Sequence, residues 1–351
     1  MTIAVLVITV LALGLIWNGM PTVARVGMLF GVTVSSNFSR SPDGRRILRG
    51  YRQIVWAATG AAIVLLLGAF SAEVRLGIVF PVVIGLQLVA YNLAVVRANR
   101  KAAMHSVDVQ LTREAQLHGR PSLIPGGATT AITQLFLFAF VFACTYIYFD
   151  TLPARLPIHW GPSGPDRWVA RTPQNVFGYL MSLMLVCIVF GIVILGIARG
   201  MRRIQALGGA GDAELWHRGF SIRVLVVLQY ALIIPAMLPL VRSDVAQQIA
   251  RFWGMGILLV IVWAVTTLMR SGQGGTHTVM TTLLEADRPL GDNTPDSCWK
   301  WGMFYYNPED SSLIVEKRFG LGQTLNFANR RSWVVLALLA APLVLLAIFA
   351  R

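Results

Sequence analysis

Charged residues are scarce in this sequence, and their scarcity excludes a soluble protein. Asp, Glu, Lys and Arg make up only 13% of the 351 residues, whereas hydrophobic residues make up 56%. An average soluble domain carries about 25% charged residues, which its water-exposed surface requires. The apolar residues also gather in blocks of roughly 17 to 25, the length of a helix that crosses a bilayer. The composition therefore predicts an integral membrane protein.

Acidic residues are fewer still, since 16 Asp and Glu oppose 30 Lys and Arg and leave a net charge of +14. A basic chain suggests nucleic-acid binding when its cations form one patch. Here 23 of the 30 cations lie in the segments after the first, third, fifth and seventh apolar blocks, when Arg223 at the start of the sixth block is counted with the segment before it. Cationic loops are retained in the cytoplasm, so both termini are expected outside a bacterial inner membrane. The cations are expected to contact membrane lipids, and no nucleic-acid partner is predicted.

Cysteine is rare, and common catalytic motifs are missing. Cys144, Cys187 and Cys298 form no CxxC pair and have no metal-ligand spacing, so neither a structural disulfide nor a zinc site is expected. The sequence contains no GxxxxGKS/T, HExxH, GxSxG or strand-led GxGxxG motif. We therefore predict that the chain is not an enzyme and carries no metal or other cofactor.

Eight apolar blocks are long enough to span a membrane as helices. The predicted fold is an all-α integral membrane protein with about eight transmembrane helices and a small cytoplasmic β-meander in its last long loop. The first block follows no cation and lacks an A-x-A cleavage site, so it is expected to remain as an anchor. The predicted spans are residues 3–20, 53–72, 76–96, 129–149, 177–198, 222–241, 252–269 and 332–350.

The blocks and the segments between them divide the chain into five parts. Within the first part, Val26 to Val34 form an apolar stretch too short to span, which predicts an interfacial or re-entrant segment. The parts are a three-span region at 1–128, a two-span unit with an outer loop (150–176) at 129–200, two further spans at 201–289, a small aromatic and basic domain at 290–327, and a last helix at 328–351.

The outer loop is rich in proline and glycine, which predicts a rigid path. The turn between His159 and Asp166 is expected to bring the imidazole and the carboxylate near each other. Trp160 and Trp168 suit the headgroup region. The predicted ligand-binding residues of the outer loop are Arg155, His159, Trp160, Asp166, Arg167 and Trp168.

Three interpretations of this loop remain open. It is a stiff connector that pins the fourth and fifth spans, a recognition site for a peptide or other ligand, or a catalytic site. A His and an Asp without a nucleophile, a second carboxylate or a metal-ligand set do not meet the demands of acid–base or covalent chemistry. The residues therefore favour the first two interpretations.

The outer loop also resembles a known domain. Leu152-Pro153, Arg155, Pro157, His159-Trp160, Gly164, Asp166 and Trp168, followed by a span, resemble a short domain of unknown function in bacterial membrane proteins. The domain occurs in the family of the immunity protein against the sporulation-delaying-protein toxin. The resemblance covers about 135–200 and implies a helical membrane protein that protects against a secreted peptide and retains a regulatory protein at the membrane. Here the unit follows three earlier spans, unlike its position near the start of the immunity protein.

The inward loop contains a short aromatic and basic domain at 290–327. Met303–Tyr306 and Leu313–Lys317 are predicted to be strands joined by a turn at Asn307–Ser311, and Gly320 and Gly322 then lead into a third strand. The segment resembles a second uncharacterised domain that often accompanies the first, through Trp301-Gly302, Tyr306-Asn307-Pro308, Lys317-Arg318 and Leu325-Asn326-Phe327. The predicted membrane-anchor or partner surface consists of Trp299, Trp301, Tyr305, Tyr306, Lys317 and Arg318.

The leading functional hypothesis is an immunity-like or sensory membrane protein that recognises an extracellular peptide at residues 150–168. The first alternative is a transporter or channel-like protein, because Pro235 and Pro239 are expected to kink the sixth span beside Gln229 and Tyr230. A bend that serves only packing explains the same residues. The third hypothesis is a membrane enzyme that acts on lipid or cell-wall precursors.

Overall fold

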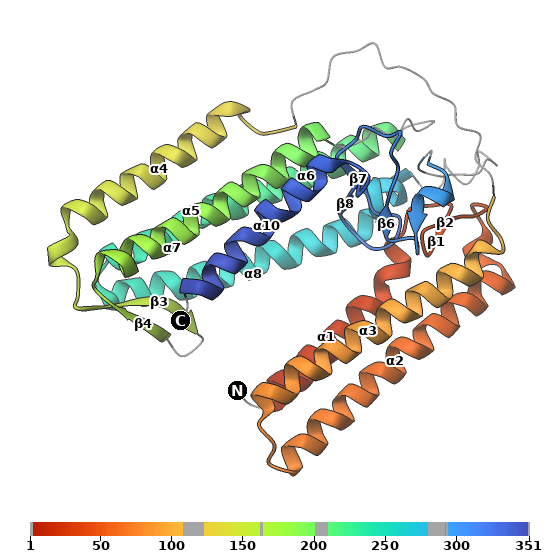
Figure 1. Cartoon of the computed structure of the whole chain (residues 1–351), viewed down its shortest axis with the longest axis horizontal. Coiled ribbons are helices and arrows are strands. Elements are labelled where there is room, and N and C mark those ends of the chain that lie inside the picture. The colour runs from red at the N-terminus through yellow and green to blue at the C-terminus, as the bar shows by residue number, and fades with distance from the viewer. Residues whose placement is uncertain are drawn as a thin grey trace. The chain divides into compact units, whose positions relative to one another are not determined.

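The chain folds into two compact units that are mostly helical (Figure 1). The structure is a computed structural model that describes residues 3–107, 123–161, 164–200, 210–279, 292 and 294–349. Unit 1 combines residues 1–116, 202–214 and 268–328, and unit 2 combines residues 117–201, 215–267 and 329–351.

Seven helical segments of the described residues are long and apolar enough to cross a membrane, which confirms a multi-pass membrane protein. Large apolar side chains such as Ile78 and Leu86 are exposed along them, as expected of a surface that faces lipid. The helices are α1 (Ile3–Gly19), α2 (Pro42–Ser71), α3 (Leu76–Ala103), α4 (Ala128–Ile147), α5 (Pro173–Leu195), α6 (Ala210–Ala231) continued by α7 (Ile233–Met237), and α8 (Ser243–Ser271).

The eighth predicted block also forms a helix, α10 (Arg330–Phe349). The seven candidate spans, which are counted over the described residues alone, do not include it. The count of eight spans therefore stays a prediction.

Several helices extend beyond their apolar blocks. Helix α2 begins at Pro42, where the Ser41 hydroxyl accepts a hydrogen bond from the Gly44 amide at 3.1 Å, although the apolar block starts only at residue 53. Proline in the first helical turn and a serine cap are both favourable there. Helix α3 continues in the same way to Ala103. Polar helical turns therefore project from the membrane-spanning part of unit 1.

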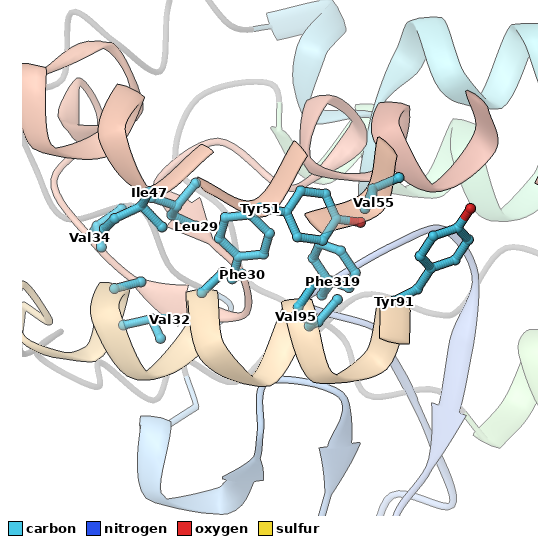
Figure 2. Close-up of a cluster of buried hydrophobic side chains, with 13 residues drawn as sticks. Leu29, Phe30, Val32, Val34, Ile47, Tyr51, Val55, Tyr91, Val95 and Phe319 are labelled. Atoms are coloured by element: carbon cyan, nitrogen blue, oxygen red, sulfur yellow. The ribbon is translucent and has the colours of Figure 1, made fainter. Parts of the chain in front are cut away.

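The apolar stretch from Val26 to Val34 was predicted to be interfacial or re-entrant, and its position relative to a bilayer stays a prediction. It forms a buried β-hairpin of β1 (Met28–Leu29) and β2 (Val32–Thr33) in unit 1. Phe30 at its turn packs against Tyr51 of α2 and Phe319, with ring centroids 4.9 and 5.4 Å away (Figure 2). The hairpin reaches the core because its side chains contact α2, α3 and the segment near Phe319.

The predicted inward meander is instead two hairpins, which a parallel bridge between Tyr305 and Asn326 joins. Strand β5 (Trp299–Lys300) pairs with β6 (Phe304–Tyr305), and β7 (Ile314–Glu316) pairs with β8 (Gln323–Leu325). Trp301 and Gly302 both have positive φ and turn the chain back before β6, so β6 pairs with β5 rather than with β7. The prediction of a turn at Gly320 and Gly322 is confirmed, since both have positive φ between β7 and β8.

Unit 2 packs α4, α5 and α7 around one apolar cluster. Phe138 and Val141 of α4 meet Leu180 of α5 and Ala236 of α7, and all four side chains are buried. A second β-hairpin lies at one end of this unit, between α4 and α5 (Figure 1).

Candidate functional site

The outer loop contains a β-hairpin, which the sequence did not predict. Strand β3 (Arg155–Gly161) pairs antiparallel with β4 (Gly164–Ala170), and the register shifts on either side of His159. Proline lacks an amide donor and is tolerated at such irregular positions, so Pro157 fits beside the bulge. Within the described residues β3 and β4 pair only with each other. Each strand therefore has one edge that pairs with no further strand.

One face of the hairpin is attached to the helical part of unit 2. Leu156 of β3 lies opposite Val169 of β4, and Leu156 packs with Leu152 and Val176 in a buried cluster. Thr172 caps the start of α5 by accepting a hydrogen bond from the Asn175 amide at 3.3 Å. The hairpin is thus held at its base by apolar burial and by the capped helix that follows.

Arg171 stabilises the base of the hairpin, a structural role that the sequence analysis did not predict. Its guanidinium donates to the carbonyl oxygens of Asp150 and Leu152, the latter at 2.9 Å, and lies 5.9 Å from the centre of the Phe149 ring. Its amide donates to the Ala154 carbonyl at 2.9 Å. One cation therefore binds the carbonyls of the turn that enters β3, and it is not available to a ligand.

Four of the six predicted outer-loop residues have exposed side chains on the hairpin. Arg155, His159 and Arg167 are exposed, and Trp168 is 47% exposed. In the register His159 lies opposite Arg167 rather than Asp166. The side chains of Trp160 and Asp166 lie outside the described residues. The exposed set is therefore two arginines, an imidazole and a large aromatic ring.

The sixth span is interrupted at Leu232, between α6 and α7, as its two prolines predicted. Pro235 and Pro239 cannot donate to the carbonyls four residues before them, those of Ala231 and Pro235. Side chains replace both donors: the Trp253 indole donates to the Ala231 carbonyl at 2.9 Å, and the Tyr179 hydroxyl donates to the Pro235 carbonyl at 3.1 Å.

Polar residues inside the spans of unit 2 also bond to one another. The Gln134 amide donates to the Gln229 carbonyl at 3.0 Å, and the Gln229 amide donates to the Cys187 carbonyl at 2.8 Å. The cavity beside Tyr179 and Pro239 measures only about 10 Å³, about the space of one water molecule. The kink is filled by side chains that satisfy its backbone.

Unit 1 contains an ionic core, defined here as the buried residues Arg25, Glu316, Asp292 and Arg318 together with the partly exposed Asp296. Arg25 and Glu316 form an ion pair at 2.5 Å, with side chains only 6% and 3% exposed. Arg318 donates from two nitrogens to the two carboxylate oxygens of Asp292, at 2.9 and 2.7 Å, and also pairs with Asp296. Two parallel hydrogen bonds of this kind match the planar guanidinium to the carboxylate and are stronger than a single neutral hydrogen bond.

The ionic core shifts the pKa values of Asp292 and Arg318. Burial alone would raise the pKa of Asp292, but the charge and hydrogen bonds of Arg318 outweigh burial and hold that pKa below its usual range. Burial lowers and the neighbouring carboxylates raise the pKa of Arg318, with a net increase. Both groups therefore remain charged at neutral pH. The core is a fixed structural element of unit 1.

Three of the six residues predicted to form an anchor or partner surface lie inside unit 1 instead. Arg318, Tyr305 and Trp299 are 1%, 0% and 6% exposed. They are buried because Arg318 needs counter-ions and the two rings pack beside it, Trp299 5.2 Å from the guanidinium. Trp301 and Tyr306 are exposed, as a residue of the predicted surface should be, and Lys317 is half-buried.

Two segments of the chain match models of protein families. Residues 136–194 match a domain of unknown function (DUF1648), and residues 308–333 match a family of unknown function (DUF5808). The first segment contains β3 and β4 with most of α4 and α5, and the second contains β7, β8 and the start of α10. No curated protein and no solved structure matches the chain.

Proposed function

We propose that the chain is an immunity-like or sensory membrane protein that recognises an extended peptide at the β3–β4 hairpin. The observation that carries this proposal is the free edge of each strand beside Trp168 and the two arginines. An extended peptide that adds to a sheet edge gains backbone hydrogen bonds, and neighbouring side chains supply its specificity. The resemblance of this unit to the toxin-immunity family supports a secreted peptide as ligand.

The side chains on the hairpin favour an acidic and aromatic peptide. Arg155 and Arg167 are exposed cations, and Trp168 offers a large ring with little conformational freedom to lose. The base of the hairpin is fixed by Arg171 and by the buried Leu156 cluster. A fixed edge binds with a smaller ordering cost than a flexible loop.

A challenge experiment tests this proposal. Cells that lack the protein are exposed to a panel of secreted antimicrobial peptides and complemented with wild type, Trp168→Ala, or Tyr148→Ala as a matched control. Tyr148 is 55% exposed near the hairpin but lies outside its strands. Loss of protection by Trp168→Ala alone, at normal membrane abundance, supports recognition. Equal sensitivity of the null strain and wild type across the panel contradicts it.

Edge pairing has its own test in the peptide. A peptide against which the protein protects cells is synthesised with N-methyl groups on alternate residues. The methyl groups remove backbone amide donors but keep the side chains. Binding to the purified protein is expected to fall when the methylated residues face the strand edge and to persist in the other alternation. Equal binding of both methylated forms would leave side-chain contacts as the mode of recognition and refute strand addition.

On the opposite side of the membrane we assign Trp301 and Tyr306 to the contact with the bilayer or a regulatory protein, since both rings are about half exposed in unit 1. The transport alternative gains no support from the kink, because Trp253 and Tyr179 occupy the carbonyls that a transported ion or solute would need. The enzyme alternative gains no support from the exposed hairpin side chains that the structure describes, since none of Arg155, His159, Arg167 and Trp168 is a hydroxyl or thiol nucleophile.

A further inference from the structure

A groove of about 650 Å³ lies between α2 and α3 in unit 1. It is lined by residues 46–57 of α2 and residues 94–101 of α3. The proposed peptide recognition at the β3–β4 hairpin does not involve it. Four of its residues are cations: Arg46, Arg49, Arg97 and Lys101.

Helical spacing brings the four cations to this groove. Arg46 and Arg49 are three residues apart on α2, and Arg97 and Lys101 are four residues apart on α3, so each pair shares one helix face. All four side chains are exposed. Gly50 lies beside them, and a Cβ atom added there would meet nothing within 4 Å. The absent side chain at Gly50 therefore leaves the groove open between the cations.

The other end of the groove is apolar. Ile54 and Ala57 of α2 line it, and Ala57 lies about 16 Å farther along the helix axis than Arg46 at 1.5 Å per residue. The apolar block of α2 begins near residue 53. The cations are therefore at the depth of lipid phosphates, and Ile54 and Ala57 are at the depth of acyl chains.

The groove carries an unbalanced positive charge. The residues that line it include no Asp or Glu. Asp43, which lies outside the groove, forms an ion pair with Arg46 at 3.7 Å, but the two side chains are 56% and 80% exposed. Exposed pairs of this kind contribute little free energy. An anion that reaches the groove therefore meets four cations with little competition.

We propose that this groove binds one anionic glycerophospholipid. Its phosphate lies between the arginines of α2 and the cations of α3, because guanidinium groups pair with phosphate oxygens through forked hydrogen bonds. Its acyl chain lies along Ile54 and Ala57. A free phosphate ion would use only the cationic end, so the combination of charge and apolar floor assigns the site to a lipid.

Native mass spectrometry of the full-length protein tests the site with phosphatidylglycerol, phosphatidylcholine and glycerol 3-phosphate as probes. The variant Arg49→Gln/Lys101→Gln removes one groove cation from each helix. Its matched control, Arg45→Gln/Arg100→Gln, removes one exposed cation per helix outside the groove. Each cation near an anionic headgroup contributes about fivefold in affinity, so the groove variant is expected to lose about 30-fold for phosphatidylglycerol. The control is expected to lose less than about threefold.

A steric variant separates a site from general surface charge. Gly50→Leu places a branched side chain between the cations while every cation remains, and it is expected to weaken retention of phosphatidylglycerol as strongly as the loss of two groove cations. Normal binding by Gly50→Leu, or an equal loss in the matched control, would overturn the proposal in favour of diffuse attraction. Competition by glycerol 3-phosphate at the affinity of the lipid would overturn it in favour of a soluble anion. Preference for phosphatidylglycerol over phosphatidylcholine, lost in both groove variants, supports it.

Discussion

Removal of the Arg318 guanidinium should open the small strand domain of unit 1. Arg318 is 1% exposed and makes two bonds to Asp292, one to the Thr294 hydroxyl at 2.9 Å and one to the Gly31 carbonyl at 3.1 Å. The variant Arg318→Met leaves Asp292 charged, buried and without its main counter-ion. Breaking a buried ion pair in this way costs about 3–5 kcal/mol. Lysine at this position would keep the charge but lose the fork, so Arg318→Lys should cost about 1.5–3 kcal/mol.

Thiol labelling of a buried cysteine measures this opening. Val315 in β7 is 5% exposed and packs with Trp299 and Tyr305, so Val315→Cys reports on the domain when the three native cysteines are replaced by alanine. A loss of 3–5 kcal/mol accelerates labelling by about 140-fold to 3700-fold, since 1.4 kcal/mol corresponds to a factor of ten.

Three comparisons decide whether the reasoning is correct. Lys317→Met removes a neighbouring, half-buried cation and is expected to change the labelling rate less than about threefold. The double variant Arg318→Met/Asp292→Leu removes both charges and should recover much of the lost stability. Equal rates for Arg318→Met and Lys317→Met would refute the assignment of Arg318 as the central counter-ion.

The same pair predicts how stability depends on pH. The pKa of Asp292 is lower in the folded chain than its ordinary value of 3.8, so its contribution is complete above that ordinary value. The contribution is lost as the pH falls through the depressed folded pKa. Labelling of Val315→Cys, corrected for the thiol's own reactivity, should therefore stay constant from pH 7 to about pH 5 and rise below about pH 4. The labelling rate of the double variant, which lacks Asp292, should rise less over the same pH range.

Three further outcomes are expected. Impermeant thiol reagents on intact cells should label Thr151→Cys but leave Cys298 unlabelled, with the other two cysteines replaced; the reverse pattern would invert the predicted topology. Trp253→Phe should lower thermal stability in detergent by about 0.6–1.7 kcal/mol, and Pro235→Ala should reduce that effect in a double-mutant cycle because it restores a backbone donor. Gly31→Ala should cost more than about 3 kcal/mol in the labelling assay, since a Cβ there overlaps the Gly302 backbone and the residue has φ +79°.

The helices were predictable because a bilayer imposes a simple requirement on the sequence. Each span needs about 20 apolar residues, and seven of the eight predicted blocks correspond to helices that meet the length and hydropathy requirements. The break in the sixth span was also predictable, because Pro235 lacks an amide donor. The side chains that compensate were not predictable. Trp253 lies 22 residues from Ala231, and nothing in the local pattern specifies that pairing.

The short strands were the main failure of the sequence analysis. The β3–β4 hairpin was not predicted because it contains Pro157 and Pro165, and proline usually argues against a strand. Short apolar runs such as Val26 to Val34 occur both in membrane segments and in buried hairpins. The length and composition of this run therefore could not distinguish the two structures. Arg318 resembled an ordinary surface cation, because its acidic partners lie 22 and 26 residues away in a loop.

The Arg25–Glu316 pair also constrains the order in which the chain is made. The two residues are 291 positions apart, so ribosomes adding about 5–20 residues per second complete Glu316 roughly 15–60 s after Arg25. During that interval the β1–β2 hairpin lacks Phe319 and the arginine lacks its counter-ion. The hairpin packs against α2 and α3 early, but its contact with Phe319 and the charge balance of Arg25 wait for the last strands of unit 1. Synthesis of the C-terminal strands is therefore the step that completes the core of the N-terminal unit.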